Sequence, residues 1–94
     1  MLAAGDIIRF YYQPARNPEG VRVTREYVEF CRVGLRNSVR FSNDELLKVD
    51  VSRGIIQIRG ANRKVELAYS GVSNALTLYN LLRERAMYSR RGVV

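Results

Sequence analysis

The residue types that most often perform chemistry are scarce in this sequence of 94 residues. There is no histidine, so the commonest general base and metal ligand is missing, and no Cys–His pair or Ser–His–Asp triad can form. Cys31 is the one cysteine, which excludes an internal disulfide and leaves no zinc-ligand spacing. The adjacent carboxylates Asp44 and Glu45 read as a turn, and neither Gly54 nor Gly60 opens a phosphate-binding loop before a helix. We therefore predict a protein that is not an enzyme, without cofactor, metal or small-molecule substrate, and expect Cys31 to be an inert, half-buried thiol.

Positive charge is the strongest chemical signal in the chain. The formal net charge is +7, with 16 basic against nine acidic residues, and all the basic residues except Lys48 and Lys64 are arginines. The planar guanidinium group binds phosphate or carboxylate in a bidentate manner and stays protonated. Two interpretations remain open. The arginines contact an acidic partner, or they reflect genome composition and a salt-bridged surface, as in a heat-loving organism.

The candidate contact residues are arginines and tyrosines of the predicted strands and loops, because these two types are enriched at the centres of protein interfaces. The candidates for partner binding are Arg9, Tyr11, Arg16, Arg22, Tyr27, Arg32, Arg36 and Arg40. Tyr88 is a further candidate anchor. The alternative interpretation of each tyrosine is a residue at the rim of the core with its hydroxyl in water.

The last third of the chain must position these residues, because residues 70–91 have the only clear helical period. Apolar residues recur there at spacings of three and four, which is typical of one buried helix face. They are Ala75, Leu78, Tyr79, Leu82 and Ala86, with Val72, Leu76 and Leu81 widening the stripe. We expect a helix over about 71–91, capped by Ser70 or Ser73. Arginines 83, 85, 90 and 91 would complement the negative end of its dipole.

Short strands fill about residues 6–69. In the first strand, Ile8, Phe10 and Tyr12 share one face, and Ile7, Arg9 and Tyr11 share the other. The run from 21 to 33 is too long for one straight strand. Its apolar pairs at 21 and 23 and at 28 and 30 point opposite ways unless the chain bends or turns near 24–26. Further strands are expected around 38–41, 47–51, 56–58 and 65–69, separated by turns.

These elements predict a mainly β, α+β fold in a single domain, 1–94. Six to seven short antiparallel strands would form a bent sheet, or a partly open barrel or sandwich, covered by one C-terminal amphipathic helix. The sequential turns favour a meander of neighbouring strands. The chain has no apolar run near the roughly 20 residues needed to cross a bilayer, and MLAAGD does not have the pattern of a secretory signal, so we expect a cytoplasmic location.

The order of elements resembles the pleckstrin-homology superfold, including its small prokaryotic members. VRVTREYVEFCRVG at 21–34 is similar to a strand–turn–strand of that superfold, NDELLKVDVSRGIIQIRG at 43–60 to its central hairpin, and NALTLYNLLRER at 74–85 to its closing helix. The resemblance implies a bent sheet closed by the helix. The sequence lacks the tryptophan common in that helix, and only Arg9, Arg16 and Arg22 represent the basic phosphoinositide motif, which argues against lipid binding.

We therefore expect a non-catalytic binding module, most simply a protein–protein interaction or adaptor domain that binds a protein partner or a second copy of itself. It could serve as an accessory protein of a larger assembly or filament. The alternative is a nucleic-acid-binding β surface, with phosphate contacts and stacking from residues 9–12, Arg32, Arg36 and Arg40. A second alternative is attachment to an anionic membrane surface through the same arginines.

Overall fold

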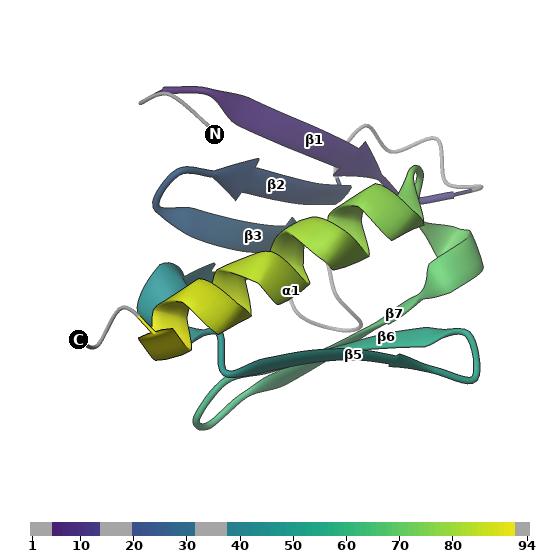
Figure 1. Cartoon of the computed structure of the whole chain (residues 1–94). Helices are drawn as coiled ribbons and strands as arrows, with labels where there is room; N and C mark the ends of the chain where they lie inside the picture. Colours follow the sequence, from purple (N-terminus) through teal and green to yellow (C-terminus); the bar gives the residue numbers. More distant parts are fainter. Residues whose placement is uncertain (1–4, 14–19, 32–37, 92–94) are drawn as a thin grey trace.

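The fold consists of seven strands in two antiparallel sheets and one C-terminal helix. The computed structural model describes residues 5–13, 20–31 and 38–91, with only the backbone for 88–91. The first sheet has the order β1 (Ile7–Tyr11), β2 (Gly20–Thr24), β3 (Tyr27–Cys31) and β4 (Ser38–Ser42), and the second β5 (Lys48–Ser52), β6 (Ile55–Arg59) and β7 (Lys64–Ala68). The predicted mainly β fold of antiparallel neighbouring strands is confirmed, but the strands form two meanders in two sheets instead of one. In the described part of the chain the sheets do not close into a barrel (Figure 1).

The first sheet turns its apolar side chains inward through a tight hairpin between β2 and β3. Val21 lies opposite Phe30, and Val23 lies opposite Val28, so the chain reverses at residues 25 and 26. The predicted break is confirmed, but a hairpin puts both apolar pairs on the same face of the sheet, and all four side chains are fully buried. The sequence also predicts that Gly34 ends this strand and that residues 14–20 form a loop. Position 34 and residues 14–19 lie outside the described residues.

The second sheet follows a one-turn 3-10 helix, η1 (Asn43–Glu45), which confirms the predicted turn there. Arg53 and Gly54 both have positive φ, at 53° and 75°, and this conformation makes the two-residue turn between β5 and β6. The inner side chains of β6 and β7 complete the core with those of the first sheet. They are Ile56, Ile58, Val65 and Leu67.

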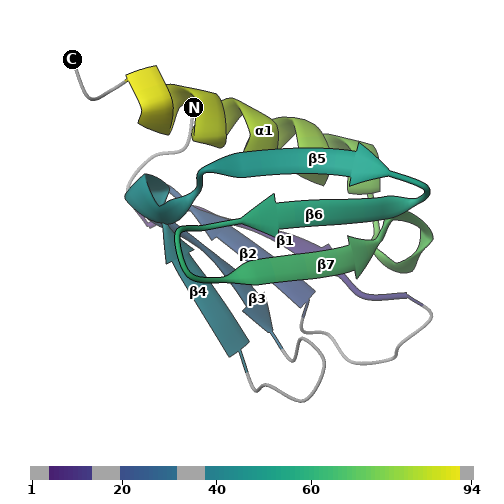
Figure 2. The same ribbon diagram turned by 90° about the horizontal axis from the view of Figure 1, so that it is seen from below.

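Helix α1 (Ala75–Arg91) runs along β5 and bridges the open side between the sheets (Figures 1 and 2). Its buried residues are Ala75, Leu78, Leu82 and Ala86, and Tyr79 and Leu81 are half-buried, as the helical period predicts. Leu76 does not widen the stripe, because its side chain lies at the flank of this face and is 58% exposed. The stripe therefore packs along β5 and belongs to the single core that it forms with residues of both sheets.

The helix begins at Ala75, later than the predicted start at 71. Residues 69–71 form a second 3-10 turn, η2 (Tyr69–Gly71), and Val72 makes a β-bridge with Tyr12. The Ser73 hydroxyl does not cap the helix as predicted, because it accepts a hydrogen bond from the Tyr11 amide at 2.8 Å. The segment before α1 is thus an extra strand pairing that joins the end of β1 to the second sheet.

Two arginine side chains form hydrogen bonds between elements that lie far apart in the sequence. Arg63, in the turn between β6 and β7, donates to the Arg40 carbonyl and to Glu45 Oε2, the latter at 2.7 Å. Arg85 donates to the Tyr27 carbonyl at 3.3 Å and to Asn43 Oδ1 at 3.1 Å. The first contact links the sheets, and the second ties α1 to the β2–β3 hairpin. No helix in the described part of the chain is long and apolar enough to span a membrane.

The core role of α1 predicts a large difference between two leucine truncations on the same helix. Leu82→Ala should lower the free energy of unfolding by about 2–5 kcal/mol, because Leu82 is fully buried and the substitution leaves a cavity. Leu76→Ala, the matched control, should change it by less than about 0.5 kcal/mol. Urea unfolding followed by circular dichroism measures both values. Equal effects would mean that α1 packs through a different face.

Glu45 predicts an acid-dependent loss of stability. The Ser42 amide donates to Glu45 Oε1 at 2.9 Å, and this bond, together with Arg63, lowers the pKa of the carboxyl below its ordinary value of 4.5. A lowered folded-state pKa gives stability that is present above pH 4.5 and is lost as the pH falls through the folded value. The stability advantage of the wild type over Glu45→Gln, measured by urea unfolding from pH 7 to pH 3, should therefore shrink below pH 4.5. Parallel curves would contradict the assignment.

Candidate functional site

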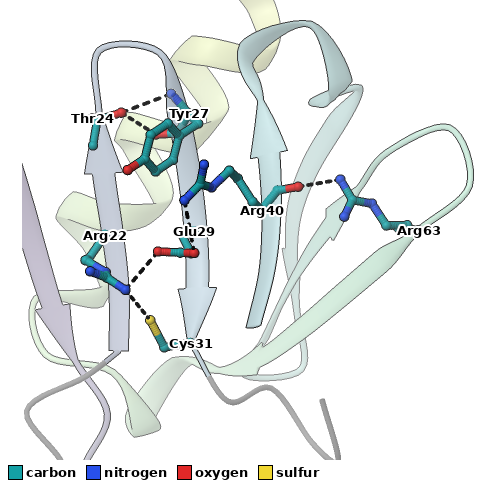
Figure 3. A network of polar contacts seen from close by, with 7 residues as sticks. All are labelled: Arg22, Thr24, Tyr27, Glu29, Cys31, Arg40 and Arg63. Atoms are coloured by element: carbon teal, nitrogen blue, oxygen red, sulfur yellow. Dashed lines mark hydrogen bonds and ion pairs between the residues drawn. The ribbon is translucent and has the colours of Figure 1, made fainter. Parts of the chain in front are cut away.

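The outer face of the first sheet gathers the candidate arginines and tyrosines that the structure describes. We define the arginine–tyrosine face as the outward side chains of β1 to β4 that surround Glu29. Its members are Arg9, Tyr11, Arg22, Tyr27, Glu29 and Arg40. Figure 3 shows the central part of this face, with Arg22 and Arg40 on either side of Glu29.

Strand register explains why these residues share a face. Arg9 is paired with Arg22, Arg22 with Glu29, and Glu29 with Arg40 in neighbouring strands, so the four form one row across the sheet. Side chains at paired positions lie on the same side of a sheet, about 5 Å apart. The side chains on the opposite face of this sheet belong to the buried core. The row is therefore fixed in place by the packing beneath it.

Glu29 is the centre of the row and is the one acidic side chain in it. Its Oε1 lies 2.9 Å from Arg22 Nη2 and its Oε2 lies 3.5 Å from Arg40 Nη2, while its own side chain is only 12% exposed. A carboxylate this buried requires paired charges and hydrogen bonds. Three guanidinium groups face one carboxylate along the row, so the face keeps a positive balance after these pairs are made.

Two side chains next to the row rigidify it. Arg22 Nη2 also lies 3.5 Å from the sulfur of Cys31, which is buried instead of half-buried as the sequence suggested. The Thr24 hydroxyl accepts hydrogen bonds from the Glu26 and Tyr27 amides at 3.2 and 3.1 Å, and this orders the hairpin. The face is therefore built on a constrained surface.

The tyrosines flank the row at different depths. Tyr27 is half-buried, and the Arg40 guanidinium lies 4.1 Å from its ring centroid in a cation–π contact. Tyr11 is 43% exposed and lies opposite Gly20. A Cβ at Gly20 would come within 2.0 Å of the Phe10 carbonyl oxygen, so only glycine permits this close approach of β1 and β2. Tyr11 thus remains the accessible aromatic ring of the described face.

The stacking platform expected around residues 9–12 is only partly present. Phe10 is 2% exposed and belongs to the core. Tyr12 also points inward, and its hydroxyl is buried with no hydrogen-bond partner among the described residues. Burial raises the pKa of the Tyr12 phenol, with a smaller contribution from Cys31, so Tyr12 stays protonated and neutral. Arg9 and Tyr11 remain outward, as the alternation in the sequence indicated.

The other candidates fall outside this face or outside the described part of the chain. Arg16, Arg32 and Arg36 lie outside the described residues, as does the side chain of Tyr88. Of the helix-end arginines, Arg83 is exposed, whereas Arg85 is half-buried. Burial lowers the pKa of Arg85, whose contacts with β3 and η1 give it a structural role that the sequence did not signal.

Among residues 5–13, 20–31 and 38–91, no group of three or more histidine, cysteine, aspartate or glutamate side chains is placed to hold a metal ion. Glu29 was not a candidate in the sequence, because a lone glutamate in a strand carries no signal until its register is known. Comparisons with protein-family models, curated proteins and solved structures found no significant match for this chain.

Glu29 should therefore be the acidic residue on which the stability of this face depends. Glu29→Gln should lower the free energy of unfolding by about 1–3 kcal/mol, because it removes a largely buried charge from two arginines and leaves them closer to mutual repulsion. Glu66→Gln is the matched control, since Glu66 is half exposed and its change should be within about 0.5 kcal/mol. Chemical unfolding at pH 7 tests both. A Glu29→Gln effect no larger than the control would show that the row is not held by this charge.

Proposed function

We propose that this chain is a non-catalytic protein-binding module that works through the arginine–tyrosine face. The observation that supports it most is that the described candidates, Arg9, Tyr11, Arg22, Tyr27 and Arg40, share one outward surface. Arginine and tyrosine contribute much of the binding energy at protein interfaces, since they combine large contact area with hydrogen bonding. The rigid row around Glu29 adds preorganisation.

The positive balance of the face indicates a partner with an acidic surface. Complementary charge guides partners together and suppresses contacts with the wrong partner, and the net charge of +7 extends that effect over the whole molecule. A module of this kind would serve as an adaptor or accessory protein of a larger assembly in the cytoplasm. We also propose kinship with the pleckstrin-homology superfold, supported by the order of four strands, three strands and a closing helix.

Nucleic-acid binding is the second candidate function. Three arginines in a row with tyrosines beside them would suit phosphates and stacked bases on a β surface. Two features weigh against it. Glu29 places a negative charge in the middle of the row, and Tyr27 is already covered by Arg40. Attachment to anionic membranes would use the same arginines and remains the third candidate.

Charge reversal on each of two sheets tests the proposal. The double variant Arg9→Glu/Arg40→Glu changes the face, and Arg53→Glu/Arg59→Glu is the control with the same change in net charge on the second sheet. Immobilised wild type and control should retain the same protein from a nuclease-treated lysate of the source organism. The face variant should retain at least tenfold less of it, because it loses two cationic contacts. Quantitative mass spectrometry measures the retained amounts.

Equal retention by both double variants would exclude the arginine–tyrosine face as the binding surface. Retention that is seen only from a lysate without nuclease treatment, together with binding of a labelled single strand that falls steeply with salt, would favour nucleic acid instead. Binding to vesicles containing phosphatidylserine but not to neutral vesicles would favour the membrane. Sedimentation of the wild type alone reports whether the retained partner is a second copy of the chain.

A further inference from the structure

Among the described residues, the first strand has an open edge beside the arginine–tyrosine face. In the sheet order, β1 is an outer strand and pairs only with β2 along its length (Figure 1). The other edge of β1 is occupied at its C-terminal end. There the Gln13 amide donates to the Gly71 carbonyl at 2.8 Å, and the Ser73 amide donates to the Tyr11 carbonyl at 2.8 Å.

These bonds show which backbone groups of β1 point away from β2. The N–H and C=O of Tyr11 are directed outward, to Ser73 Oγ and Ser73 N. In an antiparallel pair, successive residues direct these groups alternately toward and away from the partner strand. The register of β1 with β2 is continuous from Ile7 to Tyr11, so the N–H and C=O of Ile7 and Arg9 also point outward. Among the described residues, none donates to or accepts from these four groups.

The side chains along this open edge indicate which kind of strand would pair with it. Ile7 is 43% exposed and Arg9 is exposed, and both lie on the same outer face as Tyr11. Ile8 lies on the other face and is half-buried at the rim of the core. An added strand would therefore meet an apolar rim with one set of side chains and a positive charge with the other.

Charge decides which occupant fits. A symmetric antiparallel pairing of β1 with β1 of a second copy, centred on Arg9, would place two arginines directly opposite each other, which is destabilising. A carboxylate opposite Arg9 has the reverse effect, because an opposite-charge pair across neighbouring strands is stabilising. The edge therefore favours an acidic strand over a copy of itself.

We propose that the open edge of β1, from Ile7 to Arg9, accepts a short antiparallel strand from a partner protein, with acidic side chains on the outer face and apolar ones on the inner. This inference rests on the proposed protein-binding function and specifies how the partner is bound. Main-chain hydrogen bonds supply affinity and alternate side chains supply specificity in such strand addition. Ser73 occupies the edge at Tyr11 and limits the added strand to about four or five residues.

A synthetic peptide, Thr-Val-Glu-Val-Glu-Val-Thr with blocked ends, tests the inference on the full chain. Titration followed by amide chemical shifts should perturb the amides of Ile7 and Arg9, and fluorescence anisotropy should give the affinity. The matching peptide with lysine in place of both glutamates should bind at least tenfold more weakly. The variant Arg9→Glu should reverse this preference and bind the lysine peptide more tightly than the glutamate peptide.

Backbone methylation separates strand addition from docking on the flat face. Because Arg9 directs both its main-chain groups at the added strand, the residue opposite it directs both of its own groups back. N-methylation of the two glutamates should therefore weaken binding at least tenfold, whereas N-methylation of the central valine should leave it within about twofold. The replacement Ile7→Pro should weaken binding as well, since it removes an outward N–H without removing a ladder bond to β2. Thermal unfolding of Ile7→Pro checks that the fold is retained.

Equal tolerance of both methylated peptides, or no perturbation at Ile7 and Arg9, would overturn the inference. Absence of any peptide binding would also overturn it, while a protein partner lost only from the Arg9→Glu/Arg40→Glu variant would leave the proposed function intact. If neither the peptide nor a protein partner is retained, both proposals fall together.

Discussion

One core shared by two sheets and a helix stripe is the constraint on which the rest of this structure depends. Each sheet has one apolar face, and neither can bury it alone in a chain of this size. Leu78 and Leu82 fill the open side between the sheets and are fully buried. Because this core determines which side of every strand points inward, it also determines which side chains remain on the outside. The arginine–tyrosine face is therefore a consequence of core packing.

Glu29 shows what such an outer face requires to be stable. Side by side in neighbouring strands, guanidinium groups repel one another, and a central carboxylate offsets that repulsion. Arg22 and Arg40 reach Glu29 from both sides, while Arg9 at the end of the row has no ion pair among the described residues. The row is thus neutralised at its centre and remains positive at the β1 end. Under the proposed function, that gradient would direct an acidic partner to β1.

Much of this arrangement follows from two patterns in the sequence, the helical period near the C-terminus and the alternation of side chains along the strands. Alternation alone placed Arg9 and Tyr11 on the face opposite Ile8 and Phe10, and the helical period identified Leu78 and Leu82. Contacts between distant parts of the chain are a different matter. Nothing local indicates that Arg85 binds the β2–β3 hairpin.

The register between strands is the main feature of the structure that the sequence alone does not predict. In one straight strand the apolar pairs of β2 and β3 would point to opposite faces. The hairpin with Val21 opposite Phe30 brings them to one face. The role of Glu29 also depends on this register, because it comes from the position of Glu29 between Arg22 and Arg40. The start of α1 was placed too early because the pairing of Ser73 with Tyr11 depends on where β1 lies in space.

The residues before α1 link the helix to the accessible edge of β1. Gly71 and Ser73 close the edge at Tyr11 and Gln13, and two residues after Ser73 the helix begins. The same backbone groups that position the first turn of α1 therefore set the length of edge left open. A longer open edge would expose more unpaired backbone and favour aggregation, whereas complete closure would leave no site for a strand. The placement of Ser73 keeps the opening short, and Arg9 at the end of the opening disfavours a pairing that would set it against Arg9 of a second copy.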